Sequence, residues 1–394
     1  MSLIPSPFEF SYGGTSLLFG RGCIERLGEE LDDRGLSRAL IVCGSNVGAN
    51  RALIDPIERS LGDRHAGTFD GTTPEKLAET VYEGIDAVHE VSADVIVGVG
   101  GGSSLDIARQ MSAYDDDGRS LSDFRDELEA DGRVVPPAPE DPLPVVVVPT
   151  TLVGADISKR GSVEIASASA SPTGQPIRTS GTITPFANVY DPELFATTPQ
   201  GAMVGSAMNG FNKGIENLYA ADATPITDAT SMHGLGLFAD GLRRLDRLDG
   251  LEHAVAGVIL VQFERRTSII HAFGHGFSRR YDLQQGVAHA VVTPDVLRYV
   301  FEHVDGRRDL IARGLNIETD SLDDDDVADA IVSEVTDIRD GLGLPRRIRD
   351  LDVVERDDLS AIAEFIVDDA PMARAPAGLD ATPDAIESVL DRMW

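Results

Sequence analysis

The sequence predicts an α/β domain with a parallel sheet, followed by a domain made mostly of helices. In the first half of the 394 residues, short apolar runs alternate with stretches of helical spacing. From about residue 199 onward, apolar residues recur every three or four positions, which is the spacing of a buried helix face. At roughly 150 residues per domain, a chain of this length is too long for one ordinary core. We therefore expect two domains of different class.

Three apolar runs of the first half are predicted strands. They cover residues 38–43, 94–99 and 143–148. Each run ends at a turn that contains glycine or proline, at Gly44, at Gly100 and at Pro149. Strands that alternate with helices form a parallel sheet, and ligands bind at the carboxyl ends of its strands. All three turns are expected at that edge.

The turn after the second strand consists of Gly100, Gly101 and Gly102, followed by Ser103. Without Cβ atoms the backbone turns sharply and its N–H groups can approach a ligand, while the dipole of the next helix favours a negative group. The turn has neither the GxGxxG nor the Walker pattern. From the residues alone, a phosphate site and a plain strand-to-helix connection both remain open.

The boundary between the domains is predicted at residue 192. Pro185, Pro192 and the strand-like pair Val189 and Tyr190 close the first unit. The Ser-, Ala- and Thr-rich residues 167–184 are expected to form a loop or hairpin. Residues 1–192 would then be the α/β domain and residues 193–394 the helical domain.

Acidic residues outnumber basic ones by 66 to 34, which gives a formal net charge of −32. At molar salt the Debye length falls to about 3 Å and screens such self-repulsion. We therefore expect an acidic, halophilic protein of a high-salt cytoplasm, with no nucleic-acid partner, because nucleic acids require clustered Lys and Arg. The chain has no apolar run near the roughly 20 residues that cross a bilayer, no export signal, and only two cysteines, Cys23 and Cys43. These features also favour the cytoplasm and exclude a membrane partner.

Five motifs in order resemble the iron-containing alcohol dehydrogenase superfamily, which includes glycerol dehydrogenases, maleylacetate reductases and, more distantly, dehydroquinate synthases. They are the GGGS of residues 100–103 with Asp106, the PTT of 149–151 before the GAD of 154–156, the DPEL of 191–194, the HAFGH of 271–275, and the YD of 281–282 with the GVA of 286–288. Residues 150–156 and 208–219 are most similar to the maleylacetate reductase branch. The resemblance implies a Rossmann-like dinucleotide-binding domain followed by a helical domain, the dehydroquinate synthase-like fold.

The resemblance also implies that the chain binds NAD(P) through the turns at the carboxyl ends of its strands. The candidate cofactor residues are Gly44, Ser45, Asn46, Gly100, Gly101, Gly102, Ser103, Asp106, Thr150 and Thr151. Alternatively, Asp106 caps the helix, and the two threonines are merely β-branched residues at a strand end. No carboxylate follows the first strand to repel a 2′-phosphate, and Ser45, Asn46 or Arg51 could bind one. The cofactor is therefore expected to be NADP rather than NAD, by a slight margin.

Relatives that use a metal hold it with one Asp and three His. The matching positions here are Asn209, Lys213, His271 and Gln285, so only His271 retains a ligand. A catalytic divalent site needs about three protein ligands, and a lysine ammonium has no lone pair and repels a cation. We therefore expect no iron or zinc at this site.

Lys213 is one of only three lysines in the chain. Its ammonium could replace the metal charge and stabilise negative charge on a substrate oxygen. Alternatively, Lys213 extends to solvent or pairs with Glu216. His275 matches a proton relay of the family, and an imidazole suits that role because its ordinary pKa is near 6.5. Catalysis is thus assigned to Lys213, His275 and His271, although the two histidines could also be a structural pair. His289 matches a histidine of the maleylacetate reductase branch or is simply exposed.

The sequence is thus predicted to encode an NAD(P)-dependent oxidoreductase that works without a metal. It would transfer a hydride between nicotinamide and a small alcohol, carbonyl or enone, as a homodimer or larger homo-oligomer. Three alternatives remain: a maleylacetate reductase proper, a cofactor-binding homologue without catalysis, and a non-redox lyase of the dehydroquinate synthase type.

Overall fold

The computed structural model describes residues 8–12, 14–167, 169–171, 176–263 and 265–394. The described chain divides into two compact units. The α/β unit holds residues 8–151 and 155–198, and the helical unit holds residues 152–154 and 199–394. The predicted fold class is therefore confirmed.

Seven strands of the described α/β unit form one sheet in the order β1-β2-β9-β6-β5-β3-β4. The first pair is antiparallel and every other neighbouring pair is parallel. The strands are β1 (Phe8–Tyr12), β2 (Thr15–Phe19), β3 (Ala39–Val42), β4 (His65–Phe69), β5 (Val95–Gly100), β6 (Val145–Pro149) and β9 (Ala187–Tyr190). The three predicted strands are confirmed as β3, β5 and β6, which are adjacent in the sheet.

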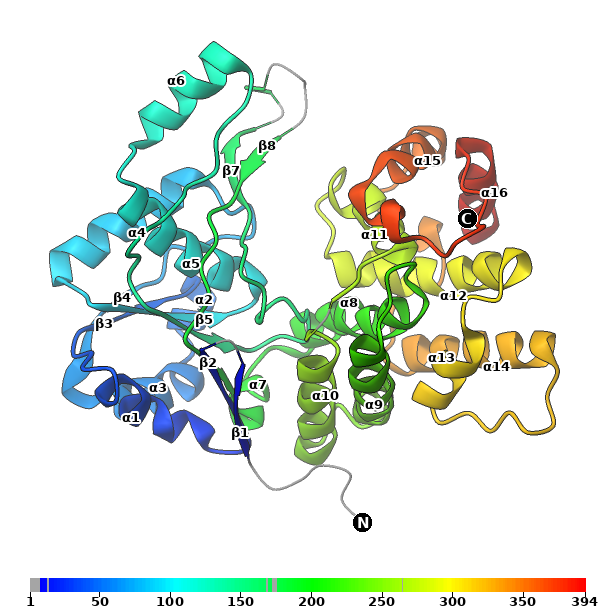
Figure 1. The fold of residues 1–394 in the computed structure, drawn as a ribbon, viewed down its shortest axis with the longest axis horizontal. Coiled ribbons are helices and arrows are strands. Elements are labelled where there is room, and N and C mark those ends of the chain that lie inside the picture. The colour runs from blue at the N-terminus through cyan, green and yellow to red at the C-terminus, as the bar shows by residue number, and fades with distance from the viewer. Residues whose placement is uncertain (1–7, 13, 168, 172–175, 264) are drawn as a thin grey trace. The chain divides into compact units, whose positions relative to one another are not determined.

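Helices cover both faces of this sheet, with α1 and α3 on one face and α4 and α5 on the other (Figure 1). The helical elements of the unit are η1 (Cys23–Arg26), α1 (Leu27–Asp32), α2 (Ser45–Gly48), α3 (Arg51–Leu61), η2 (Gly62–Arg64), α4 (Ala78–Val91), α5 (Gly102–Asp117), α6 (Leu121–Asp131) and α7 (Pro192–Phe195). In addition, β7 (Val163–Ala166) pairs antiparallel with β8 (Ile177–Thr179). A hairpin thus lies where a loop or hairpin was predicted, although residues 168 and 172–175 fall outside the described residues.

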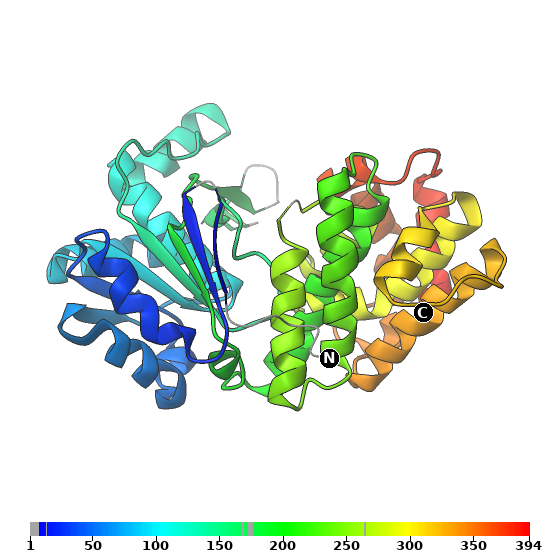
Figure 2. The same ribbon diagram turned by 60° about the horizontal axis from the view of Figure 1, so that its bottom comes forward.

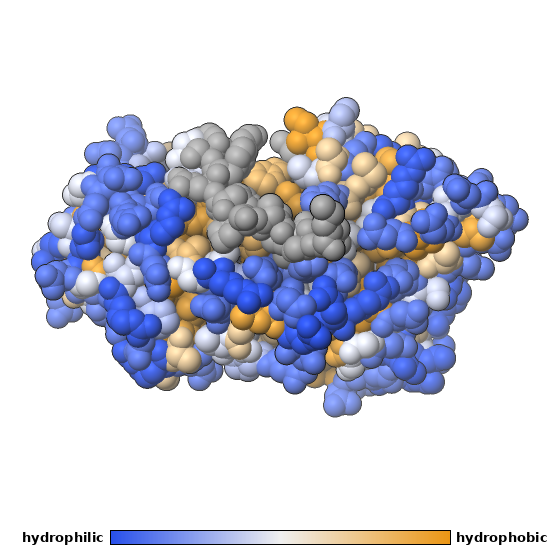
Figure 3. All heavy atoms as spheres, turned by 90° about the horizontal axis from the view of Figure 1, so that it is seen from below, coloured by the Kyte–Doolittle hydropathy of each residue, from blue (hydrophilic) through white to orange (hydrophobic). Residues whose placement is uncertain are grey.

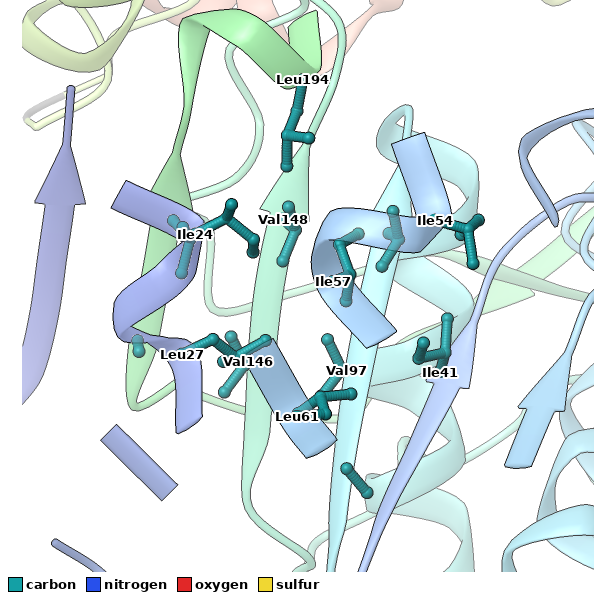
Figure 4. Close-up of a cluster of buried hydrophobic side chains, with 14 of the residues drawn as sticks. Ile24, Leu27, Ile41, Ile54, Ile57, Leu61, Val97, Val146, Val148 and Leu194 are labelled. Carbon is teal, nitrogen blue, oxygen red and sulfur yellow. The ribbon is translucent and has the colours of Figure 1, made fainter. Parts of the chain in front are cut away.

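Alternation along the central strands produces a core on each face of the sheet. Ile41, Val97 and Val146 pack against side chains of α1 and α3 in one cluster (Figure 4). Their strand neighbours Leu40 and Ile96 face the opposite cluster, against α4 and α5. Each such buried side chain contributes roughly 1.5–3 kcal/mol relative to an exposed one. The two-sided burial holds the strand ends, and the turns that follow them, in fixed positions.

The helical unit is organised around α8 (Gln200–Tyr219), in which every residue from Gly205 to Tyr219 is buried. A helix buried all round is a core helix, so its polar side chains need partners inside the protein. The other elements are α9 (Pro225–Leu242), α10 (Leu248–Leu260), α11 (Ile269–Ser278), α12 (Gln285–His303), α13 (Arg308–Gly314), α14 (Asp324–Gly341), η3 (Ile348–Asp350), η4 (Arg356–Asp358), α15 (Leu359–Asp368), η5 (Ala370–Arg374) and α16 (Pro383–Met393). Helices α9 and α10 pack side by side (Figures 1 and 2).

Hydrophilic residues predominate on the face displayed in Figure 3, with apolar residues in small scattered areas. In the described residues, no helix is both long and apolar enough to span a bilayer. Cys23 and Cys43 are both buried free thiols, and burial raises the pKa of each. Neither is therefore a reactive thiolate at neutral pH.

Candidate active site

The candidate cofactor residues lie along one edge of the sheet in the α/β unit. They occupy the turns after β3, β5 and β6, which are neighbours in the sheet. The turns also touch one another, because the backbone N–H of Thr150 donates to the carbonyl of Gly100 at 3.0 Å. Parallel strands thus bring three turns that are far apart in the sequence to one edge of the sheet, where ligands bind in sheets of this kind.

The glycine turn lies close to Thr151 and leaves open space at the N-terminus of α5. Gly100 has φ +126°, a backbone conformation that L side chains rarely adopt. A Cβ added to Gly101 would lie 3.4 Å from Cγ2 of Thr151, whereas one added to Gly102 would meet nothing within 4 Å. Gly102 is the first residue of α5, so this open space lies at a helix N-terminus. The residues present therefore fit a dinucleotide pyrophosphate, which needs close backbone N–H groups and a helix dipole.

Asp106 is held by cations within the same unit. It lies inside α5, where its carboxylate accepts from Lys76 Nζ at 2.9 Å and from Arg109 at 2.6 Å. The alternative that Asp106 caps the helix is wrong, because the residue lies one turn inside it. Ser103 is half-buried beside the turn. Thr150 is buried, and its carbonyl accepts from the Thr198 hydroxyl at 2.8 Å.

The structure adds a carboxylate beside the turn after β3. Ser45 and Asn46 are exposed on α2. Asp70 follows the neighbouring strand β4, and its Oδ2 lies 3.4 Å from the position of a Cβ added to Gly48. Arg51, expected as a possible phosphate ligand, pairs instead with Asp55 and Glu58. The electrostatics near a 2′-phosphate are thus less favourable than the sequence suggested.

Three helices of the helical unit bring the four candidate metal positions together. Asn209 and Lys213 lie one turn apart on α8, His271 lies on α11 and Gln285 begins α12. Asn209 Nδ2 donates to Gln285 Oε1 at 3.0 Å. Lys213 is close enough to His271 for its charge to lower the pKa of that imidazole.

Lys213 is a buried cation with only 3% of its surface exposed. Its Nζ donates to the carbonyl oxygens of Val153 and Gly154, the latter at 2.8 Å. Gly154 has φ +71°, which turns the short segment so that both carbonyls face the ammonium. The alternative that Lys213 extends to solvent is wrong, because the ammonium is held inside the unit. Lys213 does not pair with Glu216 either, since the Glu216 carboxylate binds His271.

Glu216 is completely buried and binds the start of α11. Its Oε1 accepts the backbone N–H of His271 at 2.9 Å, and its Oε2 contacts His271 Nδ1. Burial raises the pKa of Glu216 to about 8 and, together with the Lys213 charge, lowers that of His271 well below its usual range. Both shifts favour the neutral forms of the two side chains. Sequence reasoning missed this role, because the two residues are 55 positions apart.

Two further histidines adjoin this pair. His289 is fully buried, so its exposed alternative is wrong, and its ring lies 4.5 Å from that of His271. Its ring fits because residue 274 is glycine, where an added Cβ would lie only 2.1 Å from the imidazole. His275 Nδ1 lies 2.6 Å from the Asp369 carboxylate and is partly exposed. Asp369, from the segment after α15, is another residue that the sequence did not reveal.

The donor set does not fit a divalent metal. Within the described chain, no group of three or more His, Cys, Asp or Glu side chains is arranged to hold one. Lys213 presents a positive charge, and the two amides of Asn209 and Gln285 bind each other. Of the four candidate positions, His271 alone carries a ligand of the required kind, and its Nε2 has no partner among the described residues.

Comparison with known proteins decides the family. Residues 14–168 match the iron-containing alcohol dehydrogenase family, and residues 203–394 match the C-terminal domain of the Fe-containing alcohol dehydrogenase family. The chain belongs to the iron-containing alcohol dehydrogenase family. It is therefore an oxidoreductase, and the resemblance seen in the sequence motifs is confirmed. Members of this family are NAD(P)-dependent dehydrogenases and reductases.

Named relatives are similar along most of the chain. The NAD-dependent methanol dehydrogenase of Bacillus methanolicus is 25% identical over 86% of this chain and 88% of its own length. Maleylacetate reductase 1 of Cupriavidus pinatubonensis is 26% identical over 74% of this chain and 75% of its own. Among solved structures, a 1,3-propanediol oxidoreductase has a TM-score of 0.84 at 23% identity, covering 96% of this chain and 97% of that one. The structural match supports the dehydroquinate synthase-like fold.

Proposed function

We propose that this enzyme transfers a hydride between a nicotinamide and a small alcohol, carbonyl or enone without a divalent metal. A bound nicotinamide supplies or accepts the hydride. In the reducing direction, the substrate oxygen gains negative charge as the carbon gains the hydride. Lys213 stabilises that oxygen, which then takes a proton from His275.

The burial of Lys213 is the observation that carries this proposal. A buried ammonium acts in a region of low dielectric, where a charge stabilises a developing anion far more strongly than in water. The carbonyls of Val153 and Gly154 hold the ammonium in place before the reaction, so little reorganisation is needed. A bound metal ion would supply the same electrostatic effect.

His275 is the proposed proton donor. The Asp369 carboxylate contacts Nδ1 and fixes the ring, which leaves Nε2 for exchange with substrate or water. The ring is partly exposed, as a proton relay must be. Arg279 donates to the same carboxylate at 3.1 Å and balances its charge. His271 is held by its contact with Glu216, and we assign it to the polar lining of the same site.

The proposed cofactor is NADP(H), bound by residues 1–192, while residues 193–394 supply substrate binding and catalysis. The turn after β3 bears no carboxylate, and Ser45 and Asn46 are exposed to a 2′-phosphate. Asp70 opposes this preference, so we expect NADH to be accepted as well. The net charge of −32 supports a halophilic enzyme of a high-salt cytoplasm, and assays therefore belong in molar KCl.

The decisive experiment combines elemental analysis with turnover by the purified enzyme. A panel of aldehydes, ketones and enones, maleylacetate among them, is tested with NADPH and NADH in molar KCl. Turnover without iron or zinc, and its loss in Lys213→Met, supports the proposal. An enzyme that turns over only after taking up a divalent metal refutes it.

The same panel separates the alternatives. Turnover confined to maleylacetate identifies a maleylacetate reductase proper, an activity that the relatives of that name make a specific candidate. Cofactor binding without turnover of any panel member identifies a homologue that has lost catalysis.

A further inference from the structure

Lys76, Asp106 and Arg109 form a cluster in the α/β unit, the lysine cluster, that carries surplus positive charge. Lys76 Nζ lies 2.9 Å from Asp106 Oδ2, and a guanidinium nitrogen of Arg109 lies 2.6 Å from Asp106 Oδ1. The other hydrogen bond of Arg109 within the described chain goes to a neutral acceptor, the backbone carbonyl of Asp156. Two cations facing one carboxylate leave one net positive charge, in a chain whose net charge is −32.

The carboxylates near the lysine cluster do not cancel this charge. Glu164 lies beside the cluster in β7 and pairs with Arg178 at 3.2 Å. Glu79, near the start of α4, pairs with Arg125. Glu75 is exposed, where salt screens its charge. The surplus charge is therefore left for an anion that is not part of the chain.

Lys76 is held in place before any ligand binds. Its φ is +56°, in the left-handed region that residues with a Cβ rarely adopt. Its carbonyl accepts the backbone N–H of Glu164 at 2.9 Å, and its Nζ donates to the Ser162 hydroxyl at 3.0 Å. An ammonium has three N–H groups, and Asp106 and Ser162 accept two of them. The side chain is 22% exposed, so a ligand can reach the third.

Asp106 directs this ammonium toward the glycine turn. Gly102 begins α5 and Asp106 follows it by four residues, so both lie on the same face of the helix, one turn apart. Cα–Cβ bonds tilt toward the N-terminus of a helix, which places the Asp106 carboxylate on the side of Gly102. A Cβ added to Gly102 would meet nothing within 4 Å, so the space there is open. A group bound at the start of α5 is therefore a neighbour of the Lys76 ammonium.

We propose that the Lys76 ammonium binds the pyrophosphate of the dinucleotide, and that Asp106 positions this ammonium. A pyrophosphate bears negative charge on both of its phosphates. The N–H groups of the glycine turn and the dipole of α5 stabilise part of that charge. Lys76 adds a charge-assisted hydrogen bond to the remainder. The inference rests on the dinucleotide binding that the proposed function requires, and it does not depend on hydride transfer.

Labelling of the wild-type enzyme tests the contact directly, because the chain contains three lysines. Reductive methylation in molar KCl is quantified by mass spectrometry with ADP, with adenosine and without ligand. ADP and adenosine differ only in the pyrophosphate group. With ADP at about ten times its dissociation constant, labelling of Lys76 should fall about fivefold or more, and adenosine should leave it unchanged. Lys159, which is exposed, is the internal reference and should not respond to either ligand.

Lys76→Met removes the ammonium at similar side-chain length. Its dissociation constant for ADP, measured by calorimetry in molar KCl, should rise about tenfold to hundredfold, as expected for the loss of a charge-assisted hydrogen bond. Adenosine binding, measured by saturation-transfer NMR, should persist, which a general loosening of the turns would not allow. Lys76→Arg retains the charge and should recover part of the affinity for ADP.

Arg178→Met is the matched control. It removes another cation close to the lysine cluster, the partner of Glu164, and leaves Lys76 and Asp106 intact. Its affinity for ADP should stay within about twofold of the wild type, because the Debye length in molar salt is about 3 Å. An equal loss of affinity in Arg178→Met and Lys76→Met would mean that packing of the hairpin sets the affinity, and would overturn the inference.

ADP carries no nicotinamide, so its binding separates this inference from the proposed function. If ADP protects Lys76 and Lys76→Met binds it weakly, the inference holds even where the wild type turns over no substrate and the proposed function fails. If the wild type binds ADP with equal labelling of Lys76, or with the same affinity as Lys76→Met, the inference is wrong while the proposed function stands. Protection of Lys76 by adenosine would also overturn it, because the contact would not involve the pyrophosphate. A wild type that binds neither ADP nor NADPH refutes both.

Discussion

Replacing Lys213 by methionine tests the proposal that its fixed ammonium stabilises negative charge on the substrate oxygen, as a metal ion would. Methionine is similar in length and carries no charge, so the substitution removes the charge from the site with little change in side-chain size. One unit charge acting on an oxyanion about 4 Å away, at an effective dielectric constant of about 20, contributes about 4 kcal/mol. That energy corresponds to roughly a thousandfold in rate. We therefore expect kcat/KM to fall by about 10²–10³.

The fold is expected to survive this substitution, because two effects oppose each other. The carbonyls of Val153 and Gly154 lose a buried donor, at about 1–3 kcal/mol each. In return, the protein no longer buries a charge, which relieves a penalty of several kcal/mol. Thermal unfolding in molar KCl should therefore shift by only a few degrees, and the dissociation constant for the cofactor should not change.

Two other lysine variants complete the assay. Lys213→Arg retains the charge and should recover part of the activity. Lys159→Met makes the same chemical change at an exposed position of the α/β unit and should leave turnover intact. If Lys213→Met keeps kcat/KM within about threefold of the wild type with normal cofactor binding, the ammonium does not stabilise the transition state and the reasoning is wrong.

Three more predictions address the cofactor, the buried acid and the metal. Gly102→Val should leave the unfolding temperature nearly unchanged, because an added Cβ there meets nothing. It should weaken NADPH binding by at least about tenfold in a fluorescence titration, while Gly201→Val, at an equally open position near the start of α8, should not. Because burial raises the pKa of Glu216 to about 8, the folded state holds a proton that the unfolded chain releases above about pH 4.5. The wild type should therefore lose a few kcal/mol of stability relative to Glu216→Gln as the pH rises from about 5 to about 8, and parallel stability curves would contradict this. The triple variant Asn209→Asp, Lys213→His, Gln285→His restores three ligands beside His271 and should bind about one divalent ion per chain in elemental analysis. An unchanged metal content would show that these four side chains do not converge on one point.

The sheet and the edge at which its turns lie could be predicted from sequence because they depend on local patterns. Continuous apolar runs before glycine or proline turns are typical of buried parallel strands, and β3, β5 and β6 all obey this rule. By contrast, Asp70 was missed because the sequence does not show that β4 lies beside β3. Its carboxylate reaches the turn after β3 only through that pairing.

The candidate site in the helical unit was predictable in part. The helical spacing of Lys213 and Glu216 suggested that they pair, but both find partners in other segments. A local rule fails here because the amides at the start of α11 compete for the carboxylate and the carbonyls of residues 153 and 154 compete for the ammonium. Tertiary contacts of this kind leave no periodic trace in the sequence.

Three polar residues of helix α8 bind three different segments of the helical unit. Asn209, Lys213 and Glu216 lie within eight consecutive residues, and they bind α12, the segment of residues 152–154 and α11 respectively. A substitution that shifts the axis of this helix by a fraction of an ångström alters all three contacts at once. The energetic effects of changes at these positions should therefore not sum, and double-mutant cycles between them should give coupling energies well above those of distant pairs.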